Sequence, residues 1–287
     1  MHWMMLVLAS VASAGELDDR LLAAHGSATW SETRAALVED ASIDDATLAQ
    51  VAVGDEWRAA LSASAVLAWR ADADQAAATW SAATRESRAG TPVFDARVGT
   101  ATPAVLAERL VHAGEPVAIR RALIDQLRRT DAVWGPWVAG LLLTDADPGV
   151  RAMCAETLRY AEGDATVRAL RSALTDPDAE VRAAAARGAG WSKVGPQLVD
   201  ALVAATADAD HGVAGFAARS LGWLEAESAF DAVVRVIEGA DPRARLDALR
   251  ALERIDAARA ATHPAVQQAV SDPDEKVARA ASQITGG

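Results

Sequence analysis

The chain has 287 residues, a formal net charge of −12 and a pI near 4.9. This acidic balance argues against nucleic-acid binding, which needs clustered lysine and arginine to displace counterions from the phosphate backbone. Alanine dominates the apolar residues, runs of β-branched residues are short, and tryptophan is the only abundant aromatic, so the composition predicts an all-α fold.

The first 14 residues have the pattern of a secretory signal peptide. An apolar run over residues 4–12 leads into the small residues Ala12-Ser13-Ala14, and a polar segment starts at Gly15. We therefore expect cleavage after Ala14 and a periplasmic or secreted protein. The alternative is a cytoplasmic amphipathic start, because only His2 and the amino terminus supply positive charge. No other stretch is long enough to span a bilayer, so a membrane-spanning chain is not expected.

Residues 15–100 are predicted to form an irregular helical N-terminal region. Helical apolar spacing occurs over residues 35–38, 48–53, 57–69 and 76–83, but it keeps no regular repeat. We interpret the region as degenerate or capping repeats. Glycines and prolines between Arg88 and Pro103 then predict a hinge or an inserted loop.

A repeat occupies residues 101–287. One aspartate recurs at spacings of 31, 32, 31 and 33 residues, at Asp147, Asp178, Asp210, Asp241 and Asp274. Aspartate accepts hydrogen bonds from the free N–H groups of a first helical turn, and its charge suits the positive end of the helix. These five residues are predicted to be N-caps.

An apolar residue follows each aspartate by three positions, at Val150, Val181, Val213, Ala244 and Val277. A second amphipathic segment lies between successive capped helices, so each unit is predicted to be a helix pair. Counting back from Val150 by 31 residues reaches Ile119, which follows a predicted helix over residues 103–111. The predicted fold is therefore an α-solenoid of stacked antiparallel helix pairs.

The segment from Asp176 to Gly190 reads Asp-Pro-x-x-x-Val-Arg-x-x-Ala-Ala-x-x-x-Gly. It resembles the short repeat of the bacterial HEAT-like family first described in phycobilin lyases, and the resemblance covers residues 101–287. It implies that the arginine after each apolar residue meets a turn aspartate of a neighbouring repeat. Such arginines stand at positions 120, 151, 182 and 245. Ala214 and Ala278 stand at the same repeat position and interrupt this series of arginine–aspartate contacts, here called the ladder.

The most specific candidate site lies ten residues after each apolar residue. That position holds Arg129, Tyr160, Trp191, Trp223 and Arg254. Tryptophan, tyrosine and arginine carry much of the binding energy in protein interfaces, so this strip is a candidate partner-binding edge. The alternative is that the two tryptophans pack between repeats, with Gly190 and Gly222 ending their helices.

Other candidates favour structural roles. Trp134 and Trp137 are expected in the core, and the single cysteine, Cys154, is expected to be a small buried hydrophobe. Glu108 precedes His112 by one helical turn, and this pair is interpreted as a solvated helix face. Paired turn aspartates lack the further ligands of a calcium loop. No catalytic, metal or cofactor site is predicted.

The leading functional hypothesis is a monomeric, non-catalytic scaffold or adaptor for a protein partner of unknown identity. The resemblance to lyases implies an alternative, a lyase-like or chaperone-like protein that acts on a cofactor or client. A third possibility is a purely structural element without a discrete site. The absence of any His-Glu dipeptide argues against the di-iron hydroxylases that use HEAT-type repeats.

Overall fold

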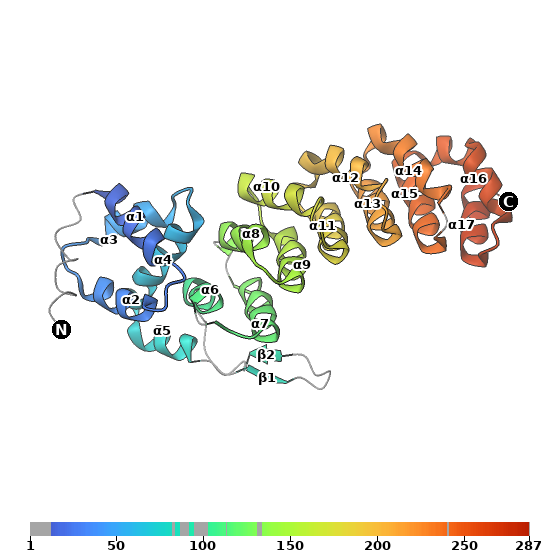
Figure 1. Cartoon of the computed structure of the whole chain (residues 1–287). Coiled ribbons are helices and arrows are strands. Elements are labelled where there is room, and N and C mark those ends of the chain that lie inside the picture. The colour runs from blue at the N-terminus through green and yellow to red at the C-terminus, as the bar shows by residue number, and fades with distance from the viewer. Residues whose placement is uncertain are drawn as a thin grey trace. The chain divides into compact units, whose positions relative to one another are not determined.

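The computed structural model describes residues 13–81, 84–86, 92–94, 103–112, 114–130, 134–239 and 241–286. The chain divides into two compact units, Met1–Gly140 and Leu141–Gly287, and each is described by itself. Helices dominate both units, so the predicted all-α fold is confirmed (Figure 1). One short antiparallel hairpin, which the sequence did not predict, pairs β1 (Thr84–Glu86) with β2 (Pro92–Phe94).

The N-terminal unit packs around one long helix. Its elements are α1 (Ala14–Ala24), α2 (Trp30–Glu39), α3 (Asp45–Ala52), α4 (Trp57–Ala71), α5 (Ala73–Trp80), α6 (Pro103–His112), α7 (Val117–Leu127) and most of α8 (Gly135–Thr144). Helix α4 contacts α1, α2, α3, α5 and α6. Its buried face consists mainly of alanine, whose small side chain lets several helices approach the same axis.

The predicted signal peptide falls largely on residues 1–12, which lie outside the described residues. Its last two residues, Ser13 and Ala14, start α1, where the Ser13 hydroxyl accepts a hydrogen bond from the N–H of Glu16 at 3.3 Å. Leu17 and Leu21 of this helix are fully buried in the core of the unit. Of the predicted hinge between Arg88 and Pro103, the structure describes only β2 and Pro103.

The C-terminal unit is the predicted α-solenoid of stacked antiparallel helix pairs. One row contains α9 (Pro148–Thr157), α11 (Ala179–Trp191), α13 (His211–Trp223), α15 (Pro242–Thr262) and α17 (Glu275–Thr285). The other contains α10 (Asp164–Ala173), α12 (Val199–Ala205), α14 (Phe230–Ile237) and α16 (Pro264–Gln268), as Figure 1 shows. Four 3₁₀ segments lengthen or join these helices: Leu158–Tyr160, Gly195–Leu198, Glu227–Ala229 and Ala269–Ser271.

Helix α15 is two helices joined at a break. Asp256 has non-helical backbone angles (φ −162°, ψ 92°), and its carboxylate accepts a hydrogen bond from the N–H of Arg259 at 2.9 Å. Asp256 therefore acts as a cap for a new helix rather than as an interior residue. The first part, which ends at Ile255, completes one repeat, and the second part opens the next.

Gly190 and Gly222 lie inside α11 and α13 and do not end them, so their expected role as terminators is wrong. A Cβ atom on Gly190 would lie 2.8 Å from Cα of Ser220, and one on Gly222 would lie 2.5 Å from Cα of Ala251. These glycines instead let neighbouring helices of the row touch through their backbones.

The residues expected in the core are there. Trp134 and Trp137 are buried at the start of α8, and Cys154 is a buried thiol in α9. The interpretation of these three residues as packing groups is confirmed.

Candidate functional site

Each of the five repeat aspartates is the N-cap of a helix in the C-terminal row. The carboxylates of Asp147, Asp210 and Asp241 accept from the N–H three residues on, at 2.9, 3.0 and 2.8 Å. Those of Asp178 and Asp274 accept from the N–H two residues on at 2.9 Å, and from the third at 3.4 and 3.2 Å. The same local chemistry thus fixes the start of every capped helix.

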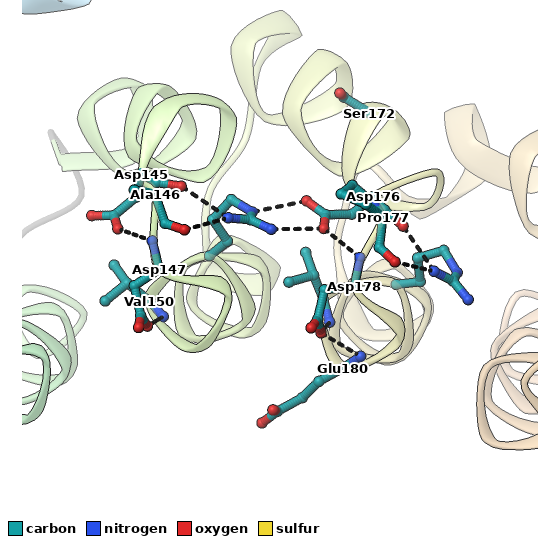
Figure 2. A network of polar contacts seen from close by, with 12 residues as sticks. Asp145, Ala146, Asp147, Val150, Ser172, Asp176, Pro177, Asp178 and Glu180 are labelled. Atoms are coloured by element: carbon teal, nitrogen blue, oxygen red, sulfur yellow. Dashed lines mark hydrogen bonds and ion pairs between the residues drawn. The ribbon is translucent and has the colours of Figure 1, made fainter.

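A second aspartate, two residues before the cap, joins a repeat to the one before it at three junctions, of which Figure 2 shows the one at Asp176. Three arginines donate two hydrogen bonds each to a carboxylate of the next repeat: Arg151 to Asp176 at 2.9 and 2.9 Å, Arg182 to Asp208 at 2.7 and 3.0 Å, and Arg245 to Asp272 at 2.8 and 2.8 Å. All six side chains are mostly covered by their neighbours. This paired geometry is the strong form of a charge-assisted hydrogen bond.

Each ladder residue also fixes the turn in which it lies. The Asp176 carboxylate accepts the N–H of the cap Asp178 at 2.9 Å. The Arg182 guanidinium donates to the carbonyl oxygens of Asp176 and Pro177, at 2.8 and 3.2 Å (Figure 2). A ladder contact therefore holds the start of one helix and its neighbour together.

The ladder lowers the pKa of its carboxyl groups. For Asp208 and Asp272 the largest cause is the hydrogen bond from the partner guanidinium, which outweighs the opposing effect of burial. For Asp176 burial is the largest single influence and raises the pKa, but the hydrogen bonds from Arg151 and Asp178 and the nearby positive charges together lower it. The charged form of each carboxylate is thus favoured by folding.

One ladder contact is missing at both of its ends. Ala214 stands where the arginine of α13 would be, and Gly239 stands where the next turn would supply the aspartate. At this junction Gly215 and Gly222 bring α13 against Ala244 and Ala251 of α15. Close backbone packing takes the place of the ladder contact, beside a longer ion pair of 3.8 Å between Arg219 of α13 and Asp247 of α15.

Three aromatic side chains, here called the aromatic edge, end successive repeats: Tyr160, Trp191 and Trp223. Trp191 and Trp223 are the last residues of α11 and α13, and their rings lie 4.2 Å apart between centroids. Trp191 remains 59% exposed, and Tyr160, at the end of its 3₁₀ segment, is 53% exposed. Packing accounts for the half-buried Trp223 but leaves most of the Trp191 ring in water.

Arg254 lies beside Trp223. Both line a pocket of about 360 Å³ between α13 and α15, together with Arg219, Arg250, Ala251 and Glu253. Arg219 places its guanidinium carbon 4.6 Å from the centre of the Trp223 ring. Arg129, the remaining residue of the predicted strip, belongs to the N-terminal unit, where it pairs with Asp125 at 2.9 Å.

Sequence reasoning missed Arg219 and Arg250. They precede Trp223 and Arg254 by four residues, so they lie on the same helix face one turn earlier. The spacing of four residues is the sequence signal for both arginines, because it places them on the same helix face as the repeat position of Trp223 and Arg254.

The interpretation of Glu108 and His112 as a solvated helix face is wrong. Glu108 is fully buried, and its two oxygens accept from the indole N–H groups of Trp30 and Trp69, at 2.9 and 3.0 Å. The guanidinium of Arg34 also donates to this carboxylate. A buried carboxylate needs such partners, and they come from α2 and α4, far away in the sequence.

Two histidines lie beside this cluster. His112 stacks on Trp30, with ring centroids 4.6 Å apart, and accepts a hydrogen bond from the N–H of Gly26 at 2.8 Å. His25 packs against both His112 and Trp57. Burial lowers the pKa of His25 to about 4 and that of His112 to about 3, so both are neutral at pH 7.

Among the described residues, no group of three histidine, cysteine, aspartate or glutamate side chains is arranged to hold a metal ion. No helix in that part of the chain combines the length and the apolar character needed to cross a membrane.

Stacked helix pairs with capped, repeating turns define the C-terminal unit as an α-solenoid. A family model of HEAT repeats matches residues 135–216. The chain is similar to two crystal structures of engineered proteins from the Northeast Structural Genomics Consortium. The first has 21% identity and a TM-score of 0.42, and the match covers 67% of this chain and 90% of that one. The second has 19% identity and a TM-score of 0.41, and covers 95% and 73%. The search of curated proteins returned no match.

Proposed function

We propose that this chain is a non-catalytic scaffold that binds a protein partner at the aromatic edge of its C-terminal unit. The observation that carries the proposal is the position of Trp191. Its ring is mostly exposed, yet Trp223 supports it from the next repeat. A large aromatic group held rigidly at the surface gains contact area on binding and loses little conformational freedom. HEAT repeats as a class support this kind of role.

Replacement of Trp191 by alanine tests the proposal. Because the side chain is mostly in water, the variant is expected to fold like the parent but to lose at least tenfold in affinity for a partner identified by crosslinking and affinity purification. Leu143→Ala is the matched control, since Leu143 is also an exposed apolar residue of this unit. Unchanged partner binding by Trp191→Ala would leave the edge with a packing role only.

A lyase-like action on a cofactor finds no support in the site. Cys154 is fully buried, so its sulfur is not available to attach a ligand. The buried Glu108 has both oxygens engaged by Trp30, Trp69 and Arg34 and is not free to transfer protons.

We further propose that the protein acts outside the cytoplasm as a monomer. The support for export is the apolar run and the Ala12-Ser13-Ala14 pattern of the sequence. The mass of the mature protein tests it: a chain that starts at Gly15 is expected, and an intact Met1 in the native host would exclude cleavage.

A further inference from the structure

The C-terminal end of the solenoid gathers positive charge although the chain as a whole is acidic. The sequence has 40 aspartate and glutamate residues against 28 lysine and arginine residues. Two pockets nevertheless adjoin on α13, α15 and α17, and we call them together the basic groove. The pocket of about 360 Å³ contains Arg219, Arg250 and Arg254. The second, of about 190 Å³, shares Arg250 and adds Lys276 and Arg279.

The groove combines these charges with apolar walls. Trp223 and Ala251 line the first pocket, and Leu246 and Ile284 line the second. Trp191 extends the apolar surface beyond Trp223, onto α11. A ligand that fits this surface carries both negative and apolar groups.

Not all of the positive charge is neutralised within the protein. Glu253 lines both pockets, and two further acidic groups, Asp247 and Glu275, contact arginines that line them. Asp247 lies 3.8 Å from Arg219 and 3.4 Å from Arg243, and Glu275 pairs with Arg279. Arg250 and Arg254 are exposed and, within the part of the chain that the structure describes, neither takes part in an ion pair.

We infer that the basic groove binds a short acidic segment of a protein partner, with an apolar residue of that segment on Trp191 and Trp223. This inference rests on the proposed scaffold function and names the chemistry of its ligand. Carboxylates are recognised by the paired N–H groups of arginine, here offered by Arg250 and Arg254. Neighbouring helix axes lie about 8–10 Å apart, so three helices span about 20 Å, the length of about six extended residues.

A protein segment fits better than a nucleic acid. The net charge of −12 repels a long polyanion, and its binding would need many phosphate contacts. Glu253 also lies in the shared part of the groove, where it would oppose a continuous row of phosphates. A segment that alternates acidic and apolar side chains avoids both penalties.

The test measures binding of capped, fluorescein-labelled seven-residue peptides by fluorescence anisotropy in low salt. One peptide library contains Asp and Glu around a single Trp or Leu, and the matched library has Asn and Gln in their place. A labelled single-stranded oligonucleotide is the third probe. The acidic library is expected to bind at least tenfold more tightly than the other two probes, and more weakly as salt rises.

The double variant Arg250→Ala/Arg254→Ala is expected to lose at least tenfold of this binding. Arg168→Ala/Arg235→Ala is its control, because it removes the same charge from exposed positions on α10 and α14, in the other row. Equal losses in the two double variants, no preference for acid over amide, or tighter binding of the oligonucleotide would each overturn the inference. A crosslinked partner that is lost in Trp191→Ala but kept in Arg250→Ala/Arg254→Ala would overturn it and leave the scaffold function standing.

Discussion

The two units differ in the polar contacts that join their short helices. The C-terminal unit repeats one polar joint, an arginine held by two hydrogen bonds to the next turn, near the surface. The N-terminal unit has joints that do not repeat, among them a buried one in which the Glu108 carboxylate accepts hydrogen bonds from two indoles and a guanidinium. Loss of one repeated joint is a local event, whereas loss of the Glu108 joint affects every helix that meets there. This difference determines how strongly each of the following changes is expected to destabilise the protein.

Glu108→Ala is expected to have the largest effect. It leaves the charge of Arg34 and two indole N–H groups without their buried acceptor, which costs about 3–5 kcal/mol. Hydrogen exchange measured by mass spectrometry should show lost protection in α2, α4 and α6 and none in α11 or α13. Glu32→Ala, at an exposed position of α2, is the control. An equal response to both changes would mean that the cluster does not hold the unit together.

Arg182→Ala should have a smaller and more local effect. It removes the two hydrogen bonds to Asp208 and the two to carbonyl groups of its own turn, at a cost of about 1.5–3 kcal/mol. Urea unfolding of Arg182→Ala, Asp208→Ala and the double variant gives the coupling energy between the pair. Additive effects would contradict a direct ladder contact, and Arg168→Ala on α10 serves as the control for charge.

Gly222→Ala tests the junction that lacks a ladder contact. The added methyl group would lie 2.5 Å from Cα of Ala251, so the helices must separate, at a cost of about 1–3 kcal/mol. In an open helix the same change stabilises by up to about 1 kcal/mol. In the uncleaved chain, Gly15→Ala, whose nearest neighbour is the Ser13 hydroxyl at 3.9 Å, should follow that rule. Thermal unfolding of the two variants should therefore shift in opposite directions.

Acidification should produce the smallest difference in stability between the two units. The pKa values of His25 and His112 fall in the fold from about 6.5 to about 4 and about 3, so the unfolded chain binds protons first. Their contribution to stability is full above pH 6.5 and declines as the pH falls towards 4. The expected loss at pH 5 is on the order of 2 kcal/mol, most of it from His112, because solvent screening reduces the contribution of the partly exposed His25.

The ladder carboxylates respond at lower pH. Folding lowers the pKa of Asp176, Asp208 and Asp272, so their stabilisation is full above the ordinary carboxyl pKa near 4 and is lost only below it. Hydrogen exchange at pH 7, 5.5 and 4.5, corrected for intrinsic rates, should show the N-terminal unit weakening first. Simultaneous weakening of both units would contradict this order.

The repeating features were readable from the sequence because their causes are local. A cap needs only the aspartate and the next turn, and a helix pair needs only apolar spacing, so the local sequence predicts the roles of Asp178 and Val181. The burial of Glu108 could not be predicted in this way, because its partners Trp30 and Trp69 lie 78 and 39 residues away and only the folded chain brings them together. The predicted boundary near residue 100 and the observed division after Gly140 differ, because α6 packs on α4 and α5.

The candidate site was readable in part. The shared repeat position of Trp191, Trp223 and Arg254 follows from the alignment of the repeats. The exposure of Trp191 does not follow from it, because a buried tryptophan and an exposed one can both stand after a glycine at this position. Arg219 and Arg250 required a comparison of helix faces between neighbouring repeats. Pocket formation depends on how α13 and α15 approach one another, which Gly222 sets through its missing Cβ.

The missing contact at Ala214 and Gly239 gives the solenoid two kinds of joint with different responses to the solution. Ion pairs weaken as salt rises, whereas apolar contact weakens on cooling. The joints at Arg151, Arg182 and Arg245 are therefore the more sensitive to salt, to the limited extent that covered pairs are screened. The junction between α13 and α15, where close apolar packing accompanies the longer contact of Arg219 with Asp247 at 3.8 Å, is the more sensitive to cold. The basic groove crosses this cold-sensitive junction, so temperature sets how firmly its walls are held.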